Sequence, residues 1–452
     1  MGENKPNHLL EGSISKSIIM IALPVIFANI LQTVYQLIDT FWVGRLGAES
    51  VAAVSLSFPI IFFLISLAMG LVMAASILVA QYNGKNDKEN VSLVTTQTFG
   101  LILLVGTILS IVGFFSSEYI LSFLTKDPIV LEQAASYLKI SFLAIVAMFI
   151  YNLFQSSLRG VGEVKIPVII ISITVLLNFF LDPIFMFGWN FIPAMGVSGV
   201  ALATLITEYL SAIIAVIFLI KGTYGVKLNL KDMIPRLVWV KKIFSLGIPS
   251  SLEMSSRSFG MLLMTFIVST FGTLAIASYG IGTRILGFII IPAIGFSLST
   301  SSIVGNNLGA RQHSRAEKIA GTGMKIGFWS LTAIGVLLFI FAANISSFFV
   351  PNEPELISMS SLFIKIMALS FGLIGIQMVV IGTFKAAGKM KTSMFLAVFQ
   401  TFLLFFLSYL FALPLGLNEL GIWIAYPTSN IIAVSVAFYF YKKKAWLKKE
   451  II

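Results

Sequence analysis

The sequence contains no cysteine and only two histidines, His8 and His313, among its 452 residues. Without cysteine the chain has no means of forming disulfides, thiolate metal sites or a thiol nucleophile. His8 lies near the N-terminus and His313 in a basic loop, so we expect no buried histidine metal site or proton relay. No G-x-x-x-x-G-K-[ST] phosphate loop occurs either. We therefore expect no cofactor and no enzymatic activity, and any active transport would have to be driven by an ion gradient.

Charged residues are also scarce. They make up only 11% of the chain, against roughly 25% in ordinary soluble domains, and the mean hydropathy is +0.98. A helix needs about 20 mostly apolar residues to cross a bilayer, and twelve stretches meet this requirement. They lie at approximately 17–43, 51–80, 92–116, 130–157, 165–188, 197–220, 239–270, 275–305, 319–346, 357–384, 392–415 and 420–441. The sequence therefore predicts an all-α polytopic membrane protein with twelve transmembrane helices, and it excludes a soluble enzyme, a secreted domain and a single-pass receptor.

Positive charge follows a regular pattern along the chain, whose formal net charge is +11. The two ends and the connectors after even-numbered spans hold 23 Lys and Arg, whereas the connectors after odd-numbered spans hold only Arg45 and Lys126. Because Lys and Arg concentrate in cytoplasmic loops, both termini are predicted to be cytoplasmic, in a multi-pass protein of the inner membrane. This pattern explains the net charge, so no nucleic-acid partner is expected. The first apolar stretch carries Asp39 and lacks a small-residue cleavage site, which indicates a retained first helix rather than a cleaved signal peptide.

The two halves of the chain resemble each other. A shift of 225 residues places Pro24 on Pro249, and each half contains six predicted spans. Six is an even number, so both halves would enter the membrane in the same orientation. We therefore expect two six-helix lobes related by a pseudo-twofold axis along the membrane normal, with a central cavity between them. The predicted parts are an N-lobe at 1–220, a basic cytoplasmic linker at 221–238, and a C-lobe at 239–452 with a basic tail.

Polar side chains inside the predicted spans gather in the N-terminal half. The fifth span carries Thr174, Asn178 and Asp182 four residues apart, which puts all three on one helix face. The first, fourth and sixth spans add Gln32, Tyr35, Gln36, Asp39, Asn152, Gln155, Ser156, Thr204, Thr207 and Glu208. No Lys or Arg lies mid-span among them. Ionisable groups at membrane depth are expensive to bury, so they mark functional sites by default.

Asp39 and Asp182 have no cationic partner in this pattern. A carboxylate in a low-dielectric site either takes up a proton or recruits a cation, and hard cations prefer several oxygen ligands. The predicted coupling site for Na⁺ or H⁺ is therefore Asp39, Asn178, Asp182 and Thr204. The alternative is hydrogen bonding between helices alone. That alternative suits Asn178 or Thr204 better than two aspartates, because asparagine would join helices at a lower desolvation cost.

The C-terminal half does not repeat these acids. It carries Glu253 and Arg257 four residues apart on the seventh span, and Arg284 on the eighth. Opposite charges at this spacing indicate a structural ion pair. A second proton-responsive or substrate-responsive site centred on Glu253 is the other interpretation.

Several motifs, in this order and spacing, resemble those of the multidrug and toxic compound extrusion (MATE) family over nearly the full length. They are Ala22-Leu-Pro24, Tyr35-Gln-Leu-Ile-Asp39-Thr-Phe-Trp-Val-Gly, Gln155-Ser-Ser-Leu-Arg-Gly160, Asn178-Phe-Phe-Leu-Asp182-Pro, Gly199-Val-Ala-Leu-Ala-Thr204, and Gly247-Ile-Pro249 followed by Glu253. The resemblance implies a secondary active antiporter that exports organic cations or amphipathic drugs in exchange for H⁺ or Na⁺ by alternating access. It also implies small-molecule substrates and a lipid bilayer as partners, and we expect a monomer.

The motifs are closest to the DinF-like branch of that family, whose N-lobe carries two aspartates. By motif position, Asp39 and Asp182 match that pair, and Pro24 matches the proline at which the first helix bends. By motif position, Tyr35, Asn152 and Gln155 match further polar positions of the same lobe. Together with Gln36, from the polar stripe of the first span, they are the candidates for a substrate cavity or its supporting polar network. The NorM-like branch has an acidic residue three positions before a glutamine on the tenth helix. Here Ile374 precedes Gln377, so a C-lobe cation site of that type is not expected.

Two alternatives remain open from the sequence. A lipid-linked oligosaccharide flippase shares the two-lobe plan, but it would need a strongly cationic cavity for pyrophosphate, and only Arg257 and Arg284 are candidates for one. A passive channel belongs to a different class and predicts polar rings around a continuous pore. The polar groups here lie mostly in one half of the chain, which favours an antiporter over a channel.

Overall fold

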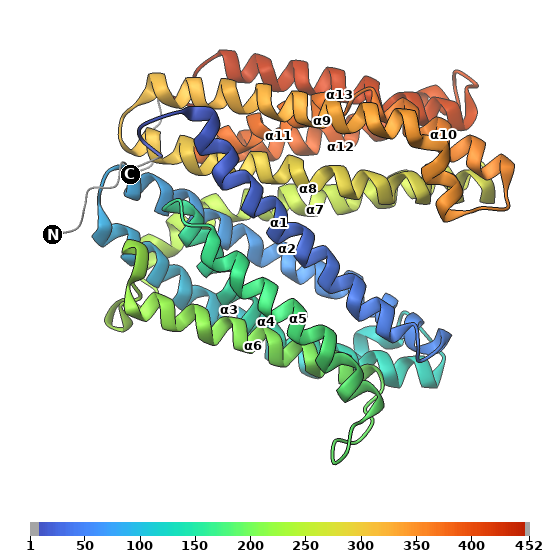
Figure 1. Cartoon of the computed structure of the whole chain (residues 1–452), viewed down its shortest axis with the longest axis horizontal. Coiled ribbons are helices and arrows are strands. Elements are labelled where there is room, and N and C mark those ends of the chain that lie inside the picture. Colours follow the sequence, from blue (N-terminus) through green and yellow to red (C-terminus); the bar gives the residue numbers. More distant parts are fainter. Residues whose placement is uncertain (1–8, 448–452) are drawn as a thin grey trace. The chain divides into compact units, whose positions relative to one another are not determined.

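A computed structural model describes residues 9–447, apart from the side chains of Leu67 and Ala68, so His8 and both extreme ends lie outside the described part. The long elements are all helices (Figure 1). The helices are α1 (Ile14–Val43), α2 (Ala48–Gly84), α3 (Lys88–Ser122), α4 (Pro128–Gly160), α5 (Lys165–Phe187), α6 (Val197–Lys221), the short 3₁₀ helices η1 (Thr223–Gly225) and η2 (Leu230–Asp232), α7 (Leu237–Ser269), α8 (Thr273–Gly309), α9 (His313–Phe349), α10 (Pro354–Ala368), α11 (Phe371–Ala386), α12 (Met390–Ala412) and α13 (Asn418–Lys442). They extend beyond most of the predicted spans, because apolarity marks only the part of a helix at membrane depth.

The helices account for the predicted membrane spans. Within residues 9–447, ten helices are long and apolar enough to cross a membrane, and α10 with α11 forms an eleventh span bent by 50°. The 33-residue helix α7 occupies the seventh predicted position, and its serines and the charged Glu253 and Arg257 lower its hydropathy. Large apolar side chains such as Phe115 are exposed on the helices, as lipid contact requires. The prediction of an all-α polytopic membrane protein is confirmed.

The bend between α10 and α11 comes directly before a part of α11 that is packed closely on α9. Gly372 and Gly375, in the first turns of α11, pack so closely against Gly327 and Phe328 of α9 that a Cβ on either glycine would overlap with that helix. Non-helical backbone at membrane depth is tolerated where protein satisfies its polar groups. Here Ser370 donates a hydrogen bond of 3.0 Å to the Met367 carbonyl. The apolar pattern of the predicted span at 357–384 does not indicate this break.

The helices form two compact units, which we call the N-unit (Phe27–Ser251) and the C-unit (the residues up to Ile26 and those from Leu252 onward). Both boundaries fall inside a helix, two residues beyond Pro24 in α1 and two residues beyond Pro249 in α7. Proline cannot donate the backbone hydrogen bond that continues a helix. The chain therefore passes from one unit to the other close to two weakened helix positions.

The two units share one packing pattern. In the N-unit, α2 packs on α3 and α4, α4 packs on α3 and α6, and α5 packs on α6. In the C-unit, α8 packs on α9 and α11, α11 packs on α9 and α13, and α12 packs on α13. Each contact of the first set has its counterpart in the second when α4 is matched to α10 with α11. The internal repeat of the sequence is thus a repeat of structure.

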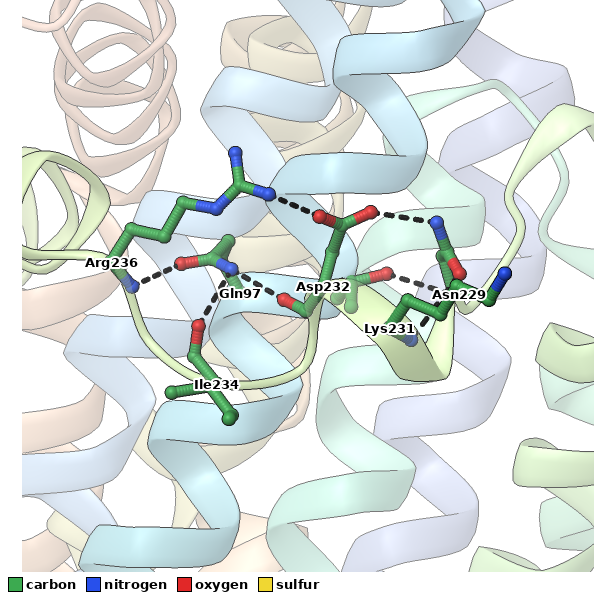
Figure 2. Close-up of polar contacts among 7 residues, drawn as sticks. Gln97, Asn229, Lys231, Asp232, Ile234 and Arg236 are labelled. Carbon is green, nitrogen blue, oxygen red and sulfur yellow. Dashed lines mark hydrogen bonds and ion pairs between the residues drawn. The ribbon is translucent and has the colours of Figure 1, made fainter.

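The basic segment between α6 and α7 is docked on α3 in the N-unit. The buried Gln97 side chain donates hydrogen bonds to the Asp232 and Ile234 carbonyls and accepts one of 2.6 Å from the Arg236 backbone N–H (Figure 2). One helical turn further along α3, Gly100 faces the Met233 carbonyl so closely that a Cβ would overlap with it. The predicted linker is therefore fixed along its length to α3 rather than free.

A methyl group at Gly100 tests this docking. We expect Gly100→Ala to displace the segment and to lower the free energy of unfolding by about 1–3 kcal/mol, the usual range for overpacking. Limited proteolysis of the purified protein should then cut between α6 and α7 faster than in the wild type. Gly321→Ala on α9 is the matched control, since a Cβ there meets nothing, and it should be neutral or slightly stabilising. Equal cleavage rates in both variants would contradict the docking.

Candidate functional site

The polar face of α5 lies inside the N-unit. Thr174, Asn178 and Asp182 are all buried, and Asn178 and Asp182 have no exposed surface. The four-residue spacing brings Asn178 over Asp182 on one helix face, and the Asn178 amide donates a hydrogen bond of 3.1 Å to Oδ1 of Asp182. The local geometry follows directly from the sequence.

Helices α1 and α6 bring the remaining predicted ligands to this face. The Thr204 hydroxyl of α6 donates a hydrogen bond of 3.4 Å to Oδ2 of Asp39 on α1. The carboxyl groups of Asp39 and Asp182 lie within hydrogen-bonding reach of each other, so that one proton would bridge them. Asp39, Asn178, Asp182 and Thr204 thus form one cluster from three helices, which we call the acid cluster.

The acid cluster has no cation within the described part of the chain. The charged neighbours that act on Asp39 are acids, Asp182 and Glu208. Three buried oxygens accept no hydrogen bond there, Oδ1 of Asp39, Oδ1 of Asn178 and Oδ2 of Asp182. Two adjacent carboxylates without a counter-ion do not both stay charged unless a proton or a cation joins them. The donor set is all oxygen, which suits Na⁺ or a proton and is unlike a transition-metal site.

Three further side chains border the acid cluster. The Tyr35 hydroxyl of α1 lies 2.5 Å from the Thr207 hydroxyl of α6, and Glu208 follows on the same helix. Tyr137 of α4 lies within electrostatic range of both aspartates. The sequence analysis already placed Tyr35 in the polar network of this lobe. Glu208 lies four residues after Thr204 on α6, so this helical spacing could have placed it beside the acid cluster. Tyr137 has no signal in the sequence, because it stands near the start of a span and outside the polar motifs.

The other predicted members of the polar network are not joined to the acid cluster. Gln36 is exposed on α1. Asn152 is buried on α4, where its amide donates a hydrogen bond of 2.8 Å to the Met148 carbonyl of the same helix. Gln155 is half-buried one turn further on. Within residues 9–447, no hydrogen bond links these three side chains to either aspartate.

The C-unit carries its own buried acid, Glu253 of α7. Its closest cation is Lys385 of α11, with Nζ 2.9 Å from Oε1, and the predicted partner Arg257 stands at 3.6 Å. The Ser393 hydroxyl donates a further hydrogen bond of 2.7 Å to Oε2. Arg284 is exposed on α8. Lys385 was counted among the residues of a cytoplasmic connector, but it lies in the last turn of α11 and its side chain is buried against Glu253.

The two buried acid sites therefore differ in charge. Glu253 is compensated by two cations and a hydroxyl, whereas the described neighbours of Asp39 and Asp182 are each other, the Asn178 amide and the Thr204 hydroxyl. A compensated carboxylate holds its charge without a mobile ion, and an uncompensated pair does not. This contrast identifies the acid cluster as the better candidate for exchanging a small cation.

Comparison with known proteins agrees with the fold and the motifs. A sequence model of the MatE family matches residues 24–184 and 249–410. The probable multidrug resistance protein YoeA of Bacillus subtilis is 27% identical, over 97% of this chain and 96% of that protein. A crystal structure of MATE in complex with MaL6 superposes with a TM-score of 0.91 at 27% identity, covering 99% of this chain and all of that one. An outward-facing multidrug resistance MATE family transporter of the MOP superfamily gives 0.91 at 26% identity, with full coverage of both chains.

The two matched segments each begin at a repeat proline, Pro24 and Pro249, and together they span well over half of the sequence. The match thus covers both halves of the internal repeat. The chain belongs to the MatE family, the multidrug and toxic compound extrusion family that its motifs resemble.

Proposed function

We propose that the protein is a secondary active antiporter that exports organic cations or amphipathic drugs in exchange for H⁺ or Na⁺. The observation that carries this proposal is the acid cluster, in which the half-buried Asp39 and the buried Asp182 lie together with no cation among the described residues. Family membership supports export of drugs, since the relative YoeA is named a probable multidrug resistance protein. We further propose a monomer in the inner membrane with cytoplasmic termini, and two lobes at 1–220 and 239–452 joined by the linker 221–238.

The proposed exchange follows from the charge of the acid cluster. A proton or Na⁺ that joins Asp39 and Asp182 cancels one of their two negative charges, and its release restores the negative charge that attracts a cationic substrate. Each ligand then weakens binding of the other, and such coupling is reciprocal and typically amounts to about 1–3 kcal/mol. Alternating access requires that neutralisation also favour one conformation. We propose Pro24 as the place where α1 bends, because the helix lacks a backbone hydrogen bond there.

The acid cluster also bears on the alternative functions. A flippase for lipid-linked oligosaccharides has to hold a pyrophosphate, and two buried acids repel one. Two cations of the C-unit, Lys385 and Arg257, are engaged by Glu253, which leaves Arg284 of the two candidates that the sequence offers for a cationic cavity. A passive channel would not need an uncompensated buried pair. Both alternatives are therefore less well supported than the antiporter.

Efflux from proteoliposomes with independently imposed gradients tests the proposal. We expect an inward gradient of H⁺ or Na⁺ to drive substrate out against its own gradient, because the ion and the substrate exchange at the acid cluster. A fluorescent organic cation serves as substrate, and empty liposomes are the control. Whichever ion drives uphill export identifies the coupling ion. Substrate movement that only follows its own gradient, under both ions, would show a channel and contradict the proposal.

A further inference from the structure

The three helices of the acid cluster share a feature one turn beyond it. Each carries a buried apolar residue four positions from its ligand, and these residues are Val43 for Asp39, Met186 for Asp182 and Val200 for Thr204. Four residues make about one turn of helix. Two of these residues follow their ligands on the odd-numbered spans α1 and α5, and the third precedes its ligand on the even-numbered span α6, so all three lie on the same side of the acid cluster. Their side chains pack into one cluster, each at most 1% exposed, which we call the apolar plug.

A polar cavity of about 370 Å³ lies next to the apolar plug in the N-unit. Leu46 lines the cavity and also packs against the plug, so the two are adjacent. Ser50 of α2 and Gln133 of α4 form another part of the wall, where the Ser50 hydroxyl donates a hydrogen bond of 2.9 Å to Oε1 of Gln133. Ser198 also lines the cavity and stands before Thr204 on α6, about 9 Å from it along the helix. The plug therefore lies between the cavity and the acid cluster.

The lining of this cavity suits a small cation. Its polar side chains all carry oxygen, and they are Ser50, Glu132, Gln133, Ser136 and Ser198. Among the described lining residues, Glu132 carries the one charge. Hard cations prefer oxygen ligands, and a cleft lined by charge of one sign raises the local concentration of the opposite ion. Leu46 and Met195 belong to the connectors after the first and fifth spans, so the cavity lies on the side that is predicted to face outward.

We propose that this cavity is the outer vestibule through which the coupling cation, Na⁺ or a hydrated proton, reaches the acid cluster, and that the apolar plug is its gate. This proposal rests on the proposed antiport function. A packed apolar layer excludes water, so it stops a hydrated ion without a charged barrier. The cation then passes only when the side chains of the plug separate.

Helix α1 supplies the member of the plug that moves. Met186 is held at the junction of α5 and α6, because the Gly196 N–H donates a hydrogen bond of 3.1 Å to its carbonyl. Gly199 of α6 lies so close to the α5 backbone that a Cβ would overlap with it. Val43 is instead the last residue of α1, one turn after Asp39. A bend of α1 would displace Val43 and Asp39 together, which links the opening of the gate to the state of the acid cluster.

Replacing Glu132 with glutamine tests the vestibule. Ion-driven export of a fluorescent organic cation from proteoliposomes is measured at a range of external ion concentrations. We expect Glu132→Gln to raise the ion concentration for half-maximal export about 2-fold to 5-fold, the effect of one nearby charge in water. The maximal rate should change less, because the acid cluster is intact. Glu118→Gln on α3 is the matched control, since Glu118 is exposed and does not line the cavity, and it should behave like the wild type.

Adding hydroxyl groups to the apolar plug tests the gate. Val43→Thr with Val200→Thr nearly keeps the size of both side chains but favours water in the layer. Uptake of the ion into proteoliposomes is measured without any organic substrate. We expect the double variant to raise this uncoupled uptake about 10-fold, which corresponds to a barrier lower by about 1.4 kcal/mol. Val91→Thr with Val94→Thr is the matched control, since both are buried valines of α3 outside the plug, and it should not raise the uptake.

The outcomes separate this proposal from the antiport function. If wild-type export follows no ion gradient, the antiport function and the vestibule both fail. If wild-type export is ion-driven and Glu132→Gln needs no more ion than the wild type, the vestibule is overturned and the antiporter stands. Unchanged uncoupled uptake in the plug variant overturns the gate, and so does an equal rise in both valine variants, which would show loosened packing in general. The Glu132→Gln measurement decides the proposal alone if the plug variant does not fold.

Discussion

Replacing Asp39 with asparagine is expected to reduce gradient-driven efflux by about 5-fold to 150-fold, the range that corresponds to 1–3 kcal/mol of coupling. Asparagine has nearly the same size and still accepts the hydrogen bond from Thr204. It carries no charge that a proton or Na⁺ could neutralise, so the two conformations would no longer respond to the gradient. The initial rate of uphill export from proteoliposomes measures the effect.

Stability separates this effect from misfolding. The asparagine variant should be as stable as the wild type or more stable, because an uncompensated buried charge is replaced by a neutral group. Glu118→Gln on α3 is the matched control, since this acid is exposed and pairs with Lys139 at 3.3 Å. Such surface pairs contribute little, so its efflux should be normal. A stable Asp39→Asn protein that exports at the wild-type rate would refute the proposed exchange.

The second aspartate extends the same argument. Asp182→Asn alone should impair coupled export as severely as Asp39→Asn, since the two carboxyl groups lie within hydrogen-bonding reach and would hold one cation between them. The double variant should be no worse than either single variant, because residues that act as one unit do not contribute additively. Additive losses would instead indicate two separate sites.

The sequence predicts which residues belong to the acid cluster better than it predicts that they come together in the fold. The spacing of Asn178 and Asp182 fixes their mutual hydrogen bond, because it depends on one helix only. Asp39 and Thr204 stand on other helices, and nothing in their local sequence states which faces of α1, α5 and α6 pack together. Their meeting point depends on packing, and before the structure only the resemblance to a known family pointed to it.

Three features could not be predicted from the sequence, each for a different physical reason. Hydropathy is averaged over many residues, so it does not register a two-residue break such as the one at Leu369 and Ser370. It also assigns a lysine at the end of a span to the aqueous connector, although the long Lys385 side chain reaches back to a buried acid. The docking of the linker on Gln97 is a third case, since one buried amide that binds three backbone groups has no periodic pattern.

Replacing Lys385 with methionine is expected to lower the free energy of unfolding by about 3–5 kcal/mol, the range for breaking a buried ion pair. Glu253 would remain buried with Arg257 at 3.6 Å as its remaining cation among the described residues, and the Arg257 side chain is 37% exposed. Methionine matches the length of lysine, so the loss of charge is the main change. Chemical denaturation in detergent micelles, followed by tryptophan fluorescence, measures the effect.

A double variant in which both members of the ion pair are neutral distinguishes a structural role of Glu253 from a coupling role. Combining Lys385→Met with Glu253→Gln should recover most of the lost stability, because no uncompensated charge then stays buried. If the ion pair is structural, this double variant also retains gradient-driven efflux. Loss of efflux in a stable double variant would instead support a second responsive site at Glu253. Lys389→Met is the matched control, since Lys389 pairs with no acid in the described part of the chain. If this variant lost as much stability as Lys385→Met, the buried ion pair would be refuted as the cause.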